Sequence, residues 1–147
     1  MIVVDANVFL RYLVQPTTPA QHTMAQQARA LFEAVLHGDE EITTAEVVLH
    51  EVAFVLASKA HYNLSAADIS AAMRLLLQMP GFRLPRGQKH VYMRALDFYV
   101  SKPKLGFADA IVAATAEHHD LPLATFDSDF DDLVTIKRWQ PLGEDRI

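Results

Sequence analysis

The sequence has 147 residues, of which 51% are hydrophobic, and it contains no cysteine. This length and composition predict one compact domain over residues 1–147, and the lack of cysteine excludes disulfides, thiolate metal sites and cysteine nucleophiles. The formal charge of −5 argues against binding nucleic acid by bulk electrostatics, unless bound cations offset the acidic residues. Because Asp5 and Arg11 interrupt the apolar N-terminus, we expect no signal peptide, no membrane span and a cytoplasmic protein.

Short β-rich runs alternate with longer helical patterns along the chain, which is typical of an α/β fold with a parallel sheet. Strands are expected at residues 2–4, 41–43, 82–84, 121–125 and 133–136. Helices are expected at residues 20–36, 45–60, 66–78, 89–100 and 107–118, with prolines near the breaks. The segments SAAD, beginning at Ser65, and TTAE, beginning at Thr43, both have the form of a helix capping box.

Two aspartates, Asp5 and Asp127, directly follow predicted strands. In a parallel sheet both would lie at the carboxyl ends of strands, which is where open α/β folds bind their ligands. A simpler interpretation stays open for each residue. Asp5 is also suited to be the N-cap of the run ANVFLRYLV, and Asp127 to be a turn residue in DSDFDD.

Glu51 lies in the helical pattern EVVLHEVAFVLA, where the residues three and four positions away are all apolar: Val47, Val48, Phe54 and Val55. Side chains at these spacings are neighbours on a helix surface, so we expect Glu51 to point into a buried apolar stripe. Glu46 is the competing glutamate of this helix. The capping box that begins at Thr43 already accounts for it.

Asp109 stands near the start of the helical run FADAIVAATA, which is apolar on most sides. A favourable interaction with the helix dipole is the simpler explanation for this aspartate. However, Asp5, Glu51, Asp109 and Asp127 are all flanked by core sequence, and no Lys or Arg within the same apolar segments neutralises all four. Such carboxylates repel one another unless cations or bound protons intervene, and an oxygen-only ligand set suits Mg²⁺ or Mn²⁺.

Four segments together resemble the acidic motifs of PIN-domain ribonucleases, and most closely those of VapC-type toxins from bacterial toxin–antitoxin pairs. The segments are IVVDANVFLRYL, VVLHEVAFVL, FADAIVAATA and LATFDSDF, which stand in the family's order over nearly the whole chain. The resemblance implies a three-layer α/β fold with a central parallel sheet flanked by helices. It also implies metal-dependent endoribonuclease activity with Mg²⁺, or alternatively Mn²⁺, as the cofactor.

The resemblance assigns the acidic quartet to Asp5, Glu51, Asp109 and Asp127, with Asn7 and Thr125 at supporting polar positions. Asp129 stands beside Asp127, so the last ligand can be either of them. The implied partners are an RNA substrate, a cognate antitoxin and a second copy of the chain. Five basic residues are candidates for RNA contact, although solvated surface positions are the simpler explanation: Arg11, Arg83, Arg86, Lys102 and Lys104.

Three other classes of protein use similar residues. A haloacid-dehalogenase-like phosphohydrolase also has an aspartate after its first strand, but it needs a second aspartate where Asn7 stands. A receiver domain needs a phospho-accepting aspartate after a central strand and a lysine after a late one, and neither is evident. A non-catalytic PIN-type interaction domain stays open as an alternative, although the presence of all four carboxylates favours an enzyme.

Overall fold

The computed structural model describes residues 1–140 and divides the chain into two compact units. Unit 1 comprises Met1–Lys89, and unit 2 begins at His90. Unit 1 contains β1 (Ile2–Val3), α1 (Ala6–Leu13), α2 (Pro19–Leu36), β2 (Ile42–Thr43), α3 (Glu46–Ala57) and α4 (Ala66–Leu77). Unit 2 contains most of α5 (Gln88–Ser101), the short 3-10 helix η1 (Pro103–Leu105), α6 (Phe107–His118) and the 3-10 helix η2 (Ser128–Phe130).

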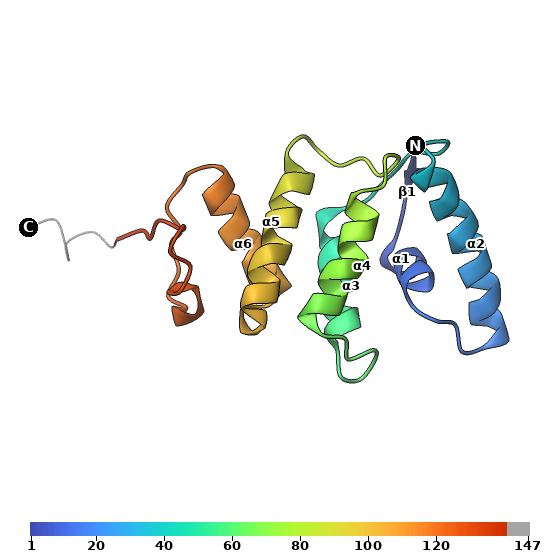
Figure 1. Ribbon diagram of the computed structural model, residues 1–147, viewed down its shortest axis with the longest axis horizontal. Coiled ribbons are helices and arrows are strands. Elements are labelled where there is room, and N and C mark those ends of the chain that lie inside the picture. The colour runs from blue at the N-terminus through green and yellow to red at the C-terminus, as the bar shows by residue number, and fades with distance from the viewer. Residues whose placement is uncertain (141–147) are drawn as a thin grey trace, which may run out of the picture. The chain divides into compact units, whose positions relative to one another are not determined.

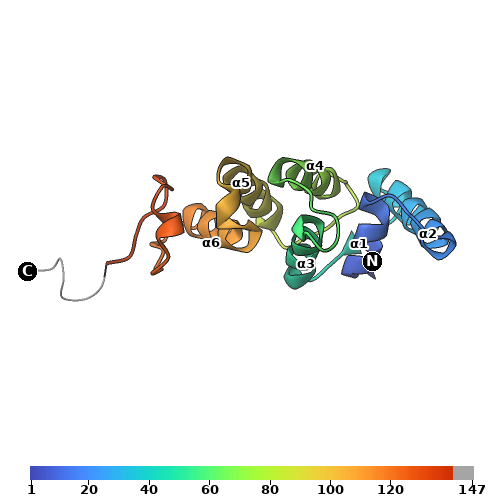
Figure 2. The same ribbon diagram turned by 90° about the horizontal axis from the view of Figure 1, so that it is seen from below.

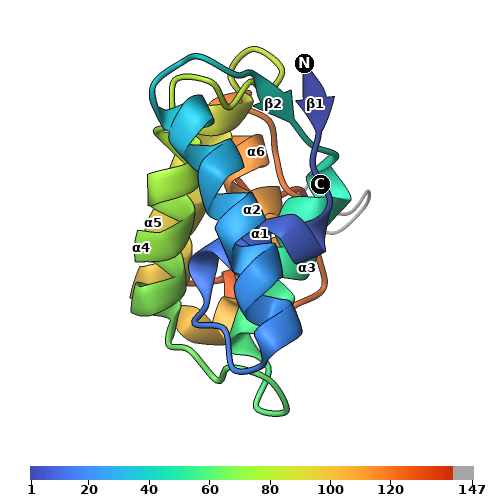
Figure 3. The same cartoon turned by 90° about the vertical axis from the view of Figure 1, so that its right-hand side faces the viewer.

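The sheet of unit 1 is parallel, as the alternation of strands and helices predicts. Ile2 pairs with Ile42 and Val3 with Thr43, so β1 and β2 run side by side in the same direction (Figure 3). Phe82 adds a parallel bridge to Ile42 on the other side of β2, inside the segment expected as the third strand. The prediction of an α/β fold with a parallel sheet is therefore confirmed.

Aromatic packing holds the helices of unit 1 around this sheet. The ring of Phe9 on α1 lies 5.5 Å from that of Phe32 on α2 and 5.7 Å from that of Phe82, and all three side chains are fully buried. Tyr12 stacks on Phe32 with ring centroids 4.5 Å apart. These contacts fix α1 alongside α2 (Figure 1). Aromatic side chains of this size contribute much of the apolar area that a small core buries.

The helix α3 packs against α1 and α4, and it buries a different face from the one that we expected. Its buried side chains are Leu49, Val52, Ala53 and Leu56. Val47 and Phe54 are 70% and 74% exposed, and Glu51 lies exposed between them. The predicted burial of Glu51 is therefore wrong. Because α3 itself carries apolar residues on nearly all of its faces, their spacing does not reveal which face is buried in the core.

One of the two predicted capping boxes provides a helix cap. The Ser65 hydroxyl accepts a hydrogen bond from the Asp68 amide (3.1 Å) at the start of α4. The box at Thr43 is wrong, because Ala45 is the N-cap of α3 and makes no side-chain capping bond. Thr44 instead donates from its hydroxyl to the Val4 carbonyl (2.6 Å), which joins the ends of β1 and β2. Thr43 itself is the last residue of β2 and lies two residues before the N-cap position of α3, so its hydroxyl does not cap that helix.

In unit 2, α5 and α6 lie side by side (Figure 2). The Phe107 ring of α6 stands 6.3 Å from that of Tyr92 and 5.9 Å from that of Tyr99, both on α5. The strand expected at residues 121–125 is reduced to a single parallel bridge between Leu123 and Arg138. Residues 133–136 contain a turn and a bend but no strand, so the strand expected there is wrong.

Candidate functional site

Asp5 caps the first helix of unit 1. The residue follows β1 and Val4, and its Oδ1 accepts a hydrogen bond from the Ala6 amide (2.7 Å) at the start of α1. The N-cap interpretation is thus confirmed, and the side chain is exposed. Because a carboxylate has two oxygens with several acceptor positions, capping a helix and binding a cation are compatible. The position also agrees with the expected edge of the sheet, since Asp5 lies just past the carboxyl end of β1.

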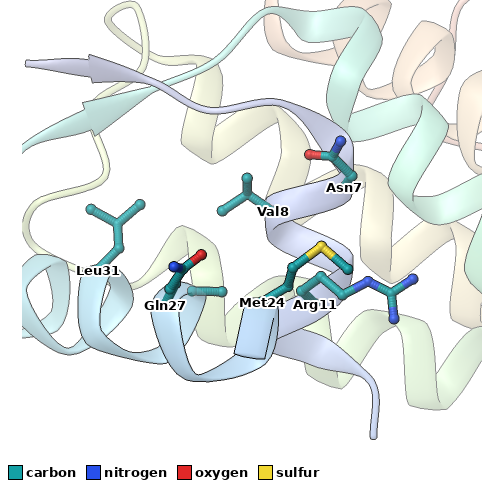
Figure 4. A pocket seen from close by; sticks show the side chains of 7 residues that line it. Asn7, Val8, Arg11, Met24, Gln27 and Leu31 are labelled. Atoms are coloured by element: carbon teal, nitrogen blue, oxygen red, sulfur yellow. The ribbon is translucent and has the colours of Figure 1, made fainter. Parts of the chain in front are cut away.

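Two further predicted residues lie in unit 1, one on α1 and one on α3. Glu51 is exposed in the middle of α3, which packs against α1. Asn7 is exposed in the first turn of α1, where it lines a pocket of about 350 Å³ between α1 and α2 (Figure 4). Arg11 lines the same pocket one turn further along α1, together with apolar side chains of α2 such as Met24.

The other predicted aspartates lie in unit 2, around the segment that follows α6. Asp109 is the third residue of α6, and Asp127 is the N-cap of η2. Asp127 Oδ1 accepts a hydrogen bond from the Asp129 amide (2.8 Å), which confirms the turn interpretation of this residue. The Thr125 hydroxyl accepts a hydrogen bond from the Asp127 amide (3.1 Å). Thr125 therefore supports the backbone that carries Asp127.

Negative charge is crowded where these aspartates meet. Burial raises the pKa of Asp109 above its ordinary value, and the charges of Asp127 and Asp129 raise it further. A cation at this place would relieve the repulsion, and carboxylate oxygens are the ligands that Mg²⁺ and Mn²⁺ prefer. Within residues 1–140, however, no three His, Asp or Glu side chains are arranged to hold a metal ion. The donor chemistry of unit 2 fits a divalent cation, and the complete quartet stays a prediction.

Basic side chains hold the segment that follows Thr125, which we call the acidic turn (residues 127–132). The Lys102 ammonium donates to the Asp129 carbonyl and to Asp132 Oδ2 (2.8 Å). The hydrogen bond and the charge of Lys102 lower the pKa of the Asp132 carboxyl. From the sequence we expected Lys102 to be a candidate for RNA contact.

Two more basic residues border the acidic turn. Lys104 Nζ stands 3.9 Å from Asp129 Oδ1, and its side chain is 81% exposed. Arg138 pairs with Asp131 (2.6 Å) and donates to the Thr125 carbonyl (3.2 Å). Sequence reasoning missed Arg138, since a lone arginine near the end of the chain carries no recognisable signal.

The sequence matches the PIN domain family over residues 2–135, which is most of the chain. The chain therefore belongs to the PIN domain family, whose members are generally metal-dependent nucleases that bind Mg²⁺ or Mn²⁺. A search of curated proteins found no match. Among the described residues, no helix has the length and apolar content needed to cross a membrane.

Proposed function

We propose that the chain is a metal-dependent endoribonuclease and acts as the toxin of a bacterial type II toxin–antitoxin pair. The observation that carries the nuclease assignment is the family match over residues 2–135. The charge distribution of unit 2 supports it, because the charges of Asp127 and Asp129 lie close enough to Asp109 to raise its pKa further after burial. Crowded carboxylates of this kind are stabilised by a divalent cation.

In this proposal the carboxylates of Asp5, Glu51, Asp109 and Asp127 hold the metal, and Asp129 is the alternative last ligand. Bound Mg²⁺ or Mn²⁺ supplies activation of a water and stabilisation of the leaving oxygen of the phosphodiester. Hydrogen bonds within the chain orient the carboxylates that would bind the metal. The Asp127 carboxylate is fixed by its bond to the Asp129 amide, so its direction is set before a cation arrives.

RNA contact requires accessible positive charge near these carboxylates, because phosphate contacts position the substrate. Lys104 meets this requirement best, since it is 81% exposed and stands next to Asp129. Its ammonium is a compact charge on a flexible stem, which suits a contact with a phosphate of variable position. Lys102 does not meet the requirement, because its ammonium is already bound to Asp129 and Asp132.

The experiment that tests the nuclease proposal measures cleavage of RNA by the purified chain with Mg²⁺, with Mn²⁺ and with EDTA. We expect cleavage only with a divalent ion. Asp109→Asn should lower the rate by roughly 100-fold, the order expected when transition-state charge loses a stabilising group. Glu46→Gln is the control and should cleave as the wild type does, because Glu46 lies just before the segment VVLHEVAFVL and outside the proposed quartet.

The alternatives predict different results in the same assay. Cleavage at full rate in EDTA contradicts a metal mechanism. Hydrolysis of a small phosphomonoester without RNA cleavage favours the haloacid-dehalogenase-like alternative, and no hydrolysis of either substrate favours the non-catalytic PIN-type interaction domain.

The resemblance to VapC-type toxins supports the toxin role, a cognate antitoxin and a homodimer. Expression of the chain in bacteria should arrest growth, and expression of Asp109→Asn should not. Sedimentation of the purified chain tests the dimer, since a monomer at all concentrations contradicts it. Growth arrest by both the wild type and Asp109→Asn would contradict a toxin that acts through RNA cleavage.

A further inference from the structure

Lys102 is a mostly covered lysine in unit 2, and it joins two segments that are distant in the sequence. Its side chain is only 20% exposed, whereas that of its partner Asp132 is 80% exposed. The ammonium donates to the Asp129 carbonyl and to Asp132 Oδ2, which lie 27 and 30 residues further along the chain. Burying the stem of a lysine in order to place its charge on a surface turn ties that turn to the body of the unit.

The backbone of Lys102 is held as firmly as its ammonium. Its amide donates to the Phe98 carbonyl (2.9 Å) at the end of α5, and its carbonyl accepts from the Leu105 amide (3.0 Å) in η1. The next residue after η1 is Gly106, which leads into α6 with a φ of +81°. Lys102 therefore stands just before the segment that delivers Asp109 into the first turn of α6.

The acidic turn needs such an anchor because its negative charges are repelled by the nearby charge of Asp109. Asp127 and Asp129 carry negative charge close to Asp109, and like charges at close range repel. The 3-10 helix η2 has only three residues, so its internal hydrogen bonds are few. Arg138 holds the turn through Asp131 and Thr125, and Lys102 holds it through Asp129 and Asp132.

We propose that Lys102 is a positioning residue that holds the acidic turn beside Asp109, so that the carboxylates of the turn can share a cation with it. The inference rests on the proposed function, because the cation belongs to that proposal. Lys102 acts through the Asp129 carbonyl and the Asp132 carboxylate and touches no substrate. It differs in this from Lys104, the exposed lysine to which we assign RNA contact.

The test compares Lys102→Met, Lys102→Arg and Asp132→Asn with the wild type. Methionine keeps most of the aliphatic stem and removes the charge, and arginine keeps the charge. Lys137→Met is the matched control, since Lys137 also forms an ion pair at 2.8 Å in unit 2, with Asp120. Two quantities are measured: amide hydrogen exchange at residues 129–131 in the metal-free chain, and the affinity for Mn²⁺ by calorimetric titration.

We expect Lys102→Met to speed exchange at residues 129–131 about tenfold, which corresponds to losing roughly 1.4 kcal/mol of local stability. Mn²⁺ affinity should fall by about 10-fold, the lower end of the loss seen when groups that orient metal ligands are removed. Lys102→Arg should recover at least part of both losses, and Lys137→Met should show neither. Asp132→Asn should speed exchange by a smaller factor, because the bond to the Asp129 carbonyl remains.

Each possible failure points to a different claim. Unchanged exchange at residues 129–131 in both Lys102→Met and Asp132→Asn overturns the positioning role. Faster exchange with unchanged Mn²⁺ affinity overturns the link between the turn and the cation. If Lys102→Met does not fold, Asp132→Asn decides, because that exposed residue can lose its ion pair without disturbing the core. A wild type that binds no Mn²⁺ refutes the proposed function, and the exchange comparison still decides whether Lys102 holds the turn.

Discussion

The pair formed by Arg94 on α5 and Glu117 on α6 should govern the acid stability of unit 2. The guanidinium and the carboxylate form two bonds, Nε to Oε1 at 2.7 Å and Nη2 to Oε2 at 3.1 Å. The Thr135 hydroxyl donates to the same Oε2 (2.5 Å), and the guanidinium lies 4.2 Å above the Phe98 ring. Glu117→Gln keeps the shape of the side chain and removes its charge. The amide oxygen can then accept only one of the two guanidinium bonds, without charge assistance, because the amide nitrogen is itself a donor.

The cost of this substitution follows from the geometry and the exposure of the pair. A hydrogen bond to a charged group contributes about 1.5–3 kcal/mol when buried, but the Arg94 and Glu117 side chains are 36% and 26% exposed. Solvent screening therefore reduces the expected loss to about 1–2 kcal/mol of unfolding free energy. For a chain of this length that loss lowers Tm by about 3–6 °C.

The same pair predicts a pH dependence. The hydrogen bond from Arg94 is the main cause that lowers the pKa of Glu117 below its ordinary value of 4.5. A lowered folded-state pKa gives stability that is present above 4.5 and is lost as the pH falls through the folded-state pKa. The difference between the wild type and Glu117→Gln should thus be largest near neutral pH and shrink in acid.

Urea denaturation at several pH values measures these differences, with Asp97→Asn as the matched control. Asp97 lies 3.8 Å from the same guanidinium, but its side chain is 54% exposed, so its loss should change stability little. The reasoning is refuted if Asp97→Asn costs as much as Glu117→Gln. It is also refuted if the cost of Glu117→Gln does not shrink as the pH falls below 4.5.

Three further predictions concern stability without metal. Asp109→Asn should raise the unfolding free energy near pH 7, because a carboxyl whose pKa is raised on folding lowers stability as the pH rises above the ordinary value of 3.8. Urea titrations that show a loss of stability instead would contradict the crowding of charge around Asp109. Gly81→Ala should lower the unfolding free energy by about 2–4 kcal/mol, since a Cβ would lie 2.2 and 2.7 Å from two backbone carbonyl oxygens. A Tm within 1–2 °C of the wild type (about 0.5 kcal/mol) would show instead that the backbone shifts easily to make room. Ser65→Ala should lower the unfolding free energy by about 1 kcal/mol and Glu46→Gln by less than about 0.5 kcal/mol, because only the serine provides a helix cap. Equal losses in chemical denaturation would contradict these roles.

The helices could be predicted from the sequence because their signals are local. The apolar spacing and the flanking residues placed a helix at residues 107–118, where α6 lies, and Ser65 indicated the start of α4. The later strands could not be predicted in the same way. Leu133 and Ile136 are buried, as their apolar character indicates, yet neither lies in a strand. Burial can be read from composition, whereas a strand also depends on a partner that the local sequence does not specify.

The candidate site shows the same division between local and distant effects. The caps made by Asp5 and Asp127 follow from their immediate neighbours, and both were foreseen as alternatives. We expected Glu51 on the buried face of α3, and it lies on an exposed face, because α3 itself carries apolar residues on nearly all of its faces. The tie between Lys102 and Asp132 spans 30 residues, so no motif could reveal it.

The most direct test of the metal-dependent nuclease is a crystal structure grown with Mn²⁺, in which anomalous scattering locates the ion. We expect an ion bound by oxygens of Asp109 and Asp127 or Asp129, with Asp5 and Glu51 at the same centre. The metal–oxygen distances should be roughly 2.1 Å, as for small hard divalent ions. An ion bound elsewhere, or an ion at Asp109 with Asp5 and Glu51 both remote from it, would contradict the four-carboxylate centre.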